Sequence, residues 1–110
     1  MILVYIACPY THPDPAANVN RAIHVANCVW DLGIVPLVPV LSHLWHLITP
    51  KPYDEWMSMD MELLSRCDAL LRVEGESCGA DKELHFAILR RMPVFYTIDE
   101  IREWQVNEQL

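Results

Sequence analysis

Residues 2–7 read ILVYIA, a continuous apolar run that stops just before the loop beginning at Cys8. A strand with apolar side chains on both faces is typical of a parallel sheet that lies between two layers of helices. Three further runs have strand-like composition, at residues 34–41, 69–73 and 94–98. We therefore expect four strands, with the first of them inside the sheet.

Longer amphipathic segments separate these runs and predict helices. Asp14 is placed to cap a helix that has Pro15 in its first position, and Gly33 is placed to end it. Apolar residues recur at helical spacing in this segment. They predict one buried stripe, made of Val19, Ile23, Ala26 and Trp30.

The alternation of short and long segments continues to the end of the chain. Residues 42–52, which contain prolines and histidines, are expected to form a loop. Thr97 followed by Glu100 has the spacing of a capping box. The remaining helices are expected at residues 53–67 and 80–92, with a last helix that ends near Trp104.

Strands that alternate with helices predict a flavodoxin-like α/β fold, a three-layer sandwich around one parallel sheet of four or five strands. Right-handed crossovers favour the strand order 2-1-3-4. Pro36 and Pro39 place the second run at an edge, because proline cannot donate to a sheet ladder. The whole chain, residues 1–110, is then one domain.

Ligands bind to such sheets beyond the carboxyl ends of the strands, near the point where the strand order reverses. This rule selects four segments before any chemistry is considered. They are residues 8–13, 42–52 and 74–79, and the start of the last helix.

Composition excludes several classes of protein. The chain has 53% hydrophobic and 21% charged residues and only 3 glycines, as expected for a compact globular domain. Its 8 Lys and Arg against 15 Asp and Glu give a net charge of −7, which disfavours binding to a nucleic acid polymer. No apolar run approaches the ~20 residues of a membrane span, and the first residues lack the basic segment of a signal peptide. The four scattered cysteines have no C-x-x-C pair, so we expect reduced thiols in a cytoplasmic protein.

Two carboxylates stand out from the helical patterns. Asp60 shares an apolar helix face with Trp56 and Leu64, where a carboxylate is costly unless it is paired or functional. Glu83 follows the run SCGADK, residues 77–82, which leads from a loop into a helix. A helix dipole favours acids there and keeps them ionised, as a nucleophile requires. Each residue has a structural alternative: a buried, hydrogen-bonded aspartate for the first and an ordinary first-turn acid for the second.

The histidines and Cys8 allow more than one interpretation. His43 and His46 have the spacing of metal ligands, and His12 could join them from the first loop. Structural or solvent-facing roles are the simpler interpretation, since the spacing match is partial. Cys8 is a small residue suited to burial, with a nucleophilic thiol as the alternative.

The order of several motifs resembles the nucleoside 2-deoxyribosyltransferase superfamily. The chain is most similar to a small branch that is related to the nucleotide 5′-monophosphate N-glycosidases, and the resemblance covers nearly all of it. The motifs are Tyr5-Ile6-Ala7-Cys8-Pro9-Tyr10, then Asp60, then Cys67-Asp68, and finally Ser77-x-Gly79-x-x-x-Glu83.

The resemblance implies N-glycosidic chemistry with three catalytic residues. Glu83 would attack the anomeric carbon and form a glycosyl-enzyme ester, which water or a second base then resolves. Asp60 would hold the sugar or base and assist proton transfer, and Tyr5 would orient the glutamate. These roles agree with the chemistry, because an oxocarbenium-like transition state needs a nearby anion and the departing base needs a proton.

The chain also departs from the family pattern. Cys8 stands where members usually carry glycine. Ser77 replaces an acidic residue of the transferase branch and matches the serine that contacts a 5′-phosphate in the glycosidase branch. That branch has an arginine in its first loop, where this chain offers only Thr11 and His12.

We therefore predict an enzyme that cleaves or transfers the N-glycosidic bond of a nucleoside or nucleoside 5′-monophosphate. No cofactor and no metal are expected. The family completes its active sites with a neighbouring subunit, which implies a homodimer or higher homo-oligomer. The alternatives are a non-catalytic nucleotide-sensing module and a metal-dependent hydrolase that uses the histidines. The predicted substrate-binding residues are Cys8, Pro9, Tyr10, His12, His43, Ser77, Gly79 and Ala80.

Overall fold

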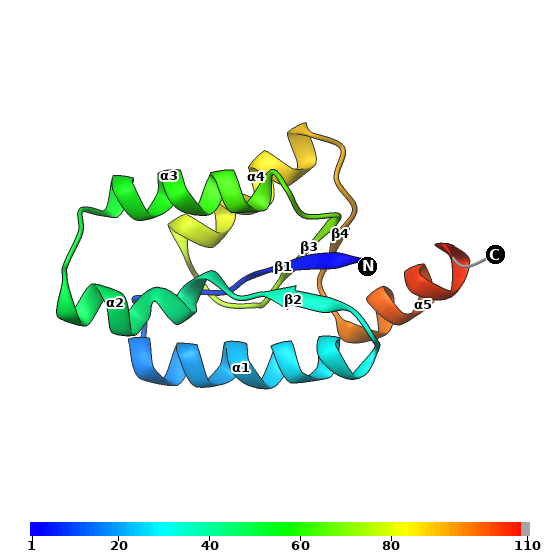
Figure 1. Ribbon diagram of the computed structural model, residues 1–110, viewed down its shortest axis with the longest axis horizontal. Coiled ribbons are helices and arrows are strands. Elements are labelled where there is room, and N and C mark those ends of the chain that lie inside the picture. The colour runs from blue at the N-terminus through cyan, green and yellow to red at the C-terminus, as the bar shows by residue number, and fades with distance from the viewer. Residues whose placement is uncertain (109–110) are drawn as a thin grey trace.

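A computed structural model describes residues 1–108 and places a four-stranded parallel sheet at the centre of the molecule (Figure 1). The strands are β1 (Leu3–Ala7), β2 (Val35–Leu37), β3 (Ala69–Arg72) and β4 (Val94–Phe95). Their order is β2-β1-β3-β4, and every neighbouring pair is parallel. The predicted α/β fold and the predicted strand order are therefore confirmed.

Helices cover both faces of this sheet. α1 (Pro15–Asp31) and α5 (Ile98–Glu108) pack on one side, whereas α3 (Tyr53–Leu64) and α4 (Cys78–Leu89) lie together on the other (Figure 1). The strand side chains alternate accordingly. Val4 and Ile6 belong to the apolar core under α1, and Tyr5 and Ala7 to the core under α3 and α4. Among residues 1–108, no helix is long and apolar enough to cross a membrane.

The second strand is shorter than predicted, and the loop after it is partly helical. β2 ends at Leu37, and a 3-10 helix, η1 (Pro39–Ser42), follows directly. Pro39 occupies the first helical position, where its missing N–H costs nothing, so the apolar run leaves the sheet there. The expected loop at residues 42–52 then contains α2 (His43–Ile48). Ser42 makes no side-chain cap and α2 buries no residue, so the usual sequence signals of a helix are missing.

The buried stripe of α1 is also different from the predicted one. The prediction of Ala26 is correct, but Ile23 and Trp30 are exposed. The buried residues are Asn18, Ala22, Ala26 and Val29. Small side chains on this stripe let the helix backbone approach the sheet, so the longer residues lie at its borders.

Other boundaries differ by a few residues. Asp14 caps α1 as predicted, with its carboxylate accepting from Ala17 N at 2.9 Å. α4 begins at Cys78 rather than at residue 80, because the Ser77 side chain accepts a hydrogen bond from Ala80 N. α5 begins at the predicted Thr97–Glu100 capping interaction but continues beyond residue 104 to residue 108.

Candidate active site

A pocket of about 570 Å³ opens beyond the carboxyl ends of β1, β2 and β3. Three of the four segments selected from the sequence contribute to it. The start of α5 does not, because Thr97 and Ile98 line a separate small cavity. The main pocket is lined by Ile6, Cys8, Tyr10, Thr11, His12, Pro39, Val40, Ser42, His46, Lys51, Tyr53, Trp56, Met57, Asp60, Glu76, Ser77, Cys78, Gly79, Ala80 and Glu83.

Glu83 reaches the pocket from the second turn of α4. Its side chain is buried, with only 6% of the residue exposed, and its Oε2 accepts a hydrogen bond from the Tyr5 hydroxyl on β1. Burial raises the pKa of Glu83 to about 8, which the Tyr5 hydrogen bond and the Arg72 charge only partly oppose. The expectation that the helix dipole keeps Glu83 ionised is therefore wrong, since the dipole acts mainly within the first turn and desolvation dominates here.

Asp60, on α3, contributes the second carboxylate of the pocket and is half-buried. Its Oδ1 is buried and has no hydrogen-bond partner within residues 1–108. Burial raises the pKa of Asp60 to about 6, and the Asp60 charge in turn raises the pKa of Glu83. The two carboxylates therefore share one cavity and interact, and one of them has a free acceptor for a ligand or a proton.

The first loop forms another side of the pocket, and α1 holds this loop in place. The buried Asn18 side chain donates to the backbone carbonyls of Tyr10 and His12, at 2.9 Å each. The Tyr10 hydroxyl lies 2.6 Å from His43 Nδ1, so His43 stands behind Tyr10 rather than in the pocket lining. Burial raises the pKa of Cys8, and its thiol points to the Asn18 carbonyl. A buried, protonated thiol does not favour the alternative in which Cys8 is a nucleophile.

The wall formed by α2 and α3 is aromatic. Trp56 Nε1 donates to His46 Nδ1 at 2.8 Å, and the backbone N–H of Lys51 approaches the same nitrogen at 3.3 Å. Because both groups are donors, His46 Nδ1 is an acceptor and the ring proton lies on Nε2. Tyr53 and Met57 continue this wall. An aromatic wall suits an aromatic heterocycle as ligand.

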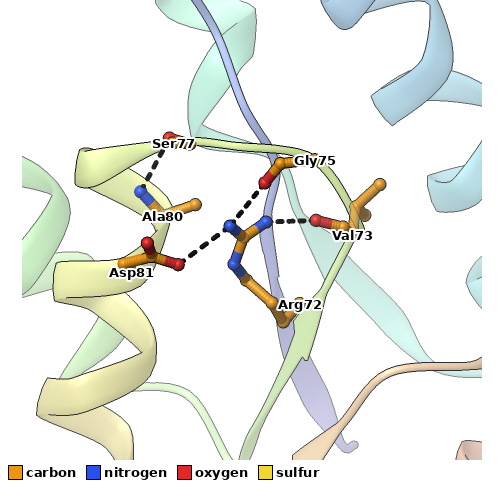
Figure 2. Close-up of polar contacts among 6 residues, drawn as sticks. All are labelled: Arg72, Val73, Gly75, Ser77, Ala80 and Asp81. Carbon is orange, nitrogen blue, oxygen red and sulfur yellow. Dashed lines mark hydrogen bonds and ion pairs between the residues drawn. The ribbon is translucent and has the colours of Figure 1, made fainter.

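The loop after β3 is organised by Arg72, the last residue of that strand (Figure 2). Its guanidinium donates to the backbone carbonyls of Val73 and Gly75 and to the carboxylate of Asp81 on α4, the last two at 2.7 and 3.0 Å. In the same view Ser77 caps Ala80 N at 3.0 Å. Gly75 has φ +128, and a Cβ there would meet Pro9 Cγ at 2.9 Å, so the first loop packs tightly against this one.

Most of the predicted site residues come together in this pocket. Tyr5, Pro9 and His43 do not line it. Tyr5 lies behind Glu83, Pro9 is buried against Gly75, and His43 lies behind Tyr10. Sequence reasoning missed Arg72 and Asn18, and it gave His46 a structural or solvent-facing role, with metal binding as the alternative. A charged residue at the end of an apolar strand, ALLR at residues 69–72, is the signal that could have identified Arg72.

The three histidines do not form a metal site with their neighbours. His43 contacts Tyr10 and His46 contacts Trp56 through their Nδ1 atoms. Within residues 1–108, no group of three or more His, Cys, Asp or Glu side chains is arranged to hold a metal ion. The four cysteines are all free.

Comparison with protein families gives a match over most of the chain. Residues 2–97 match the family described as Domain of unknown function (DUF7768). The chain belongs to the DUF7768 family. No curated protein is similar in sequence to this DUF7768 member.

Solved structures relate the DUF7768 fold to an enzyme fold. A 2-deoxyribosyltransferase from Bacillus psychrosaccharolyticus is 15% identical, with a TM-score of 0.62 over 91% of this chain and 90% of that one. A 2-desoxiribosyltransferase from Leishmania mexicana is 22% identical, with a TM-score of 0.62 over 86% of this chain. The match covers only 62% of the Leishmania protein. This DUF7768 chain therefore has a nucleoside 2-deoxyribosyltransferase-like fold.

Proposed function

We propose that this protein cleaves or transfers the N-glycosidic bond of a nucleoside or nucleoside 5′-monophosphate. The observation that carries the proposal is the pair of carboxylates in one pocket, the buried Glu83 and the half-buried Asp60, with the Tyr5 hydroxyl bonded to the first. Paired carboxylates in different environments are the machinery of glycosidic bond cleavage. The shared fold with two 2-deoxyribosyltransferases supports the same class of substrate.

In the proposed reaction, ionised Glu83 attacks the anomeric carbon, and the bond from this carbon to the base nitrogen breaks. The electron pair of that bond leaves with the base, which takes up the proton of Asp60. Water or a second base then attacks the anomeric carbon of the ester and frees the Glu83 carboxylate, with Asp60 accepting a proton. Tyr5 holds Glu83 in position through its hydroxyl.

The pocket has walls that suit the two halves of such a substrate. The base is proposed to lie against Trp56 and His46, where the wall is aromatic. The sugar is proposed to lie between Glu83 and the turn of Ser77 and Gly79 at the start of α4. Backbone N–H groups at a helix start can bind hydroxyl or phosphate oxygens.

The raised pKa of Glu83 favours a second candidate, a non-catalytic nucleotide-binding module. A carboxyl group that stays protonated near neutral pH donates a hydrogen bond to a ligand instead of attacking it. The two candidates share the pocket and differ in whether a covalent step occurs.

One experiment separates these candidates. Ribo- and deoxyribonucleosides and their 5′-monophosphates are incubated with the protein, with and without an acceptor base, and free base is measured by chromatography. Base release that Glu83→Gln abolishes supports the enzyme. Binding of the same compounds by calorimetry, without release and unaffected by Glu83→Gln, supports the binding module.

We also propose that the chain works as a homodimer or higher homo-oligomer. The support is α2, whose apolar side chains Leu44, Leu47 and Ile48 are exposed beside the pocket residue His46. Apolar side chains gathered on one surface helix commonly mark a protein interface. A second copy seated on α2 would cover them and would also border the pocket.

A further inference from the structure

The buried polar side chains within residues 1–108 are Asn18, Arg72 and Glu83. Asn18 holds the first loop, and Glu83 is the proposed nucleophile. Arg72 has no part in the proposed reaction and does not line the pocket. A buried cation with no assigned role calls for an explanation, because desolvating a charge is costly.

The three acceptors of Arg72 belong to three successive parts of the chain. Val73 directly follows β3, Gly75 lies in the loop, and Asp81 lies in the first turn of α4. Glu83 follows Asp81 by two residues. The planar guanidinium therefore ties the strand end, the loop and the helix start into one rigid unit, as Figure 2 shows.

The fold alone does not require a cation at this place. An apolar side chain of similar length would fill the same volume without a desolvation cost. What the guanidinium adds is a set of directed hydrogen bonds to the loop and a positive charge near Glu83. Both additions act on the pocket.

The groups around Glu83 act on its charge in both directions, because the Tyr5 hydrogen bond lowers its pKa whereas burial and the Asp60 charge raise it. Tyr5 faces it from β1 and donates a hydrogen bond, Asp60 faces it from α3 with a like charge, and the thiol of Cys8 is also within electrostatic range. Arg72, from β3, is the cation that acts on it and lowers its pKa against the effect of burial.

We propose that Arg72 is a positioning residue, which fixes the loop at residues 73–77 and the start of α4 and supplies the positive charge that Glu83 needs to attack as an anion. The inference rests on the proposed function in one respect, that Glu83 is the nucleophile. Asp81 is the residue through which the Arg72 guanidinium holds the start of α4.

The first test measures the titration of Glu83 without any substrate. The side-chain carboxyl is followed by carbon-13 NMR and assigned by its absence in Glu83→Gln. In Arg72→Met, Glu83 is expected to titrate about one pH unit higher than in the wild type, the usual size of a lost opposite charge. In Arg72→Lys, which keeps the charge, it titrates near the wild-type pH.

The matched control is Arg66→Met, the same change at an exposed side chain that pairs with Glu62 on α3. It should leave the Glu83 titration unchanged. A folded Arg72→Met that titrates as the wild type would overturn the electrostatic half of the proposal.

The second test measures how firmly the hydrogen bonds of Arg72 hold the loop and the start of α4. It does not depend on Arg72→Met being folded. Amide hydrogen exchange at residues 75–80 should accelerate by up to about tenfold in both Arg72→Lys and Asp81→Asn, the effect of one lost hydrogen bond. Asp81 has a side chain that is 67% exposed, so its substitution leaves the core intact. Unchanged exchange in both variants contradicts the positioning role.

These readouts separate this inference from the proposed function. Titration and exchange require no turnover, so they can support the role of Arg72 even if no compound releases a base. If base release is found, Arg72→Lys should lower kcat with little change in KM, because the pocket lining is kept. Glu83-dependent base release that Arg72→Lys leaves unchanged overturns the role of Arg72 alone.

Discussion

α4 borders the pocket on one side and α2 on another, and these two walls, the α4 wall and the α2 wall, are built in different ways. The α4 wall contains Glu83, which is buried, and it is fixed by hydrogen bonds to Tyr5 and by the Arg72 tether. The α2 wall contains no buried residue, and Leu44 and Ile48 on it are 67% and 82% exposed. The α4 wall is therefore determined within the chain, whereas α2 contacts α3 through the rings of Trp45 and Trp56 and leaves its other apolar side chains exposed. The difference suggests that chemistry is assigned to the first wall and association to the second.

The largest expected effect is loss of the reaction at the α4 wall. Glu83→Gln should lower base release by at least about a thousandfold, because the amide side chain cannot form the glycosyl ester. Glu74→Gln is the matched control, since Glu74 is exposed in the loop before α4 and does not line the main pocket. Release that survives Glu83→Gln would contradict the assignment of the nucleophile.

Glu83→Gln should lower the activity but raise the stability of the folded protein at alkaline pH. Glu83 titrates near 4.5 in the unfolded chain and at about 8 when folded, so its favourable contribution is complete below 4.5 and is lost as the pH rises to about 8. Glu83→Gln should therefore raise the melting temperature at pH 8.5 by several degrees, at roughly 4–8 °C per kcal/mol, and change it little at pH 4. Calorimetry at the two pH values checks this sign.

The next effect is a change in pH dependence. Between about pH 6 and about pH 8 the pair of carboxylates holds one proton, and the proposed reaction uses the form in which Asp60 carries it and Glu83 is ionised. The kcat/KM of the wild type should therefore rise to a plateau from about pH 6 and fall above about pH 8. Asp60→Asn removes the group that must stay protonated, so the alkaline limb should disappear and the remaining activity should rise with pH. An alkaline limb retained in Asp60→Asn would show that another group supplies the proton.

A smaller effect is expected at the α2 wall. Ile48→Asp should dissociate the proposed oligomer, and light scattering after gel filtration would show the lower mass. Val106→Asp is a control on α5, where the residue is also exposed but far along the chain from the pocket segments. A wild type that is monomeric at micromolar concentration would end the proposal that α2 is covered by a second copy.

The smallest effects are expected from two glycines of the α4 wall. A Cβ at Gly79 would make ordinary contacts of 3.4 Å or more, so Gly79→Ala should stabilise the helix by about 0.5–1 kcal/mol and narrow the pocket. Gly75→Ala should destabilise the protein by about 1–3 kcal/mol, because of its positive φ and the contact with Pro9. Urea unfolding of the two variants checks that the signs are opposite.

Several elements could be predicted because their signals are local. The apolar run of β1, the Asp14 cap and the capping interaction of Thr97 each depend on a few neighbouring residues. The prolines at 36 and 39 correctly placed β2 at an edge. The helix α2 could not be predicted, because it lacks a cap and its apolar side chains face outward.

The amino-acid sequence by itself determined the α/β class, the strand order and the segments that border the pocket, because hydrophobic periodicity and turn residues act over short distances. Only the tertiary structure decided the charge state of Glu83 and the part played by Arg72. Both depend on burial and on partners that are distant in the sequence, such as Tyr5, which lies 78 residues from Glu83. Desolvation is a property of the packed molecule, and no local pattern of residues encodes its size.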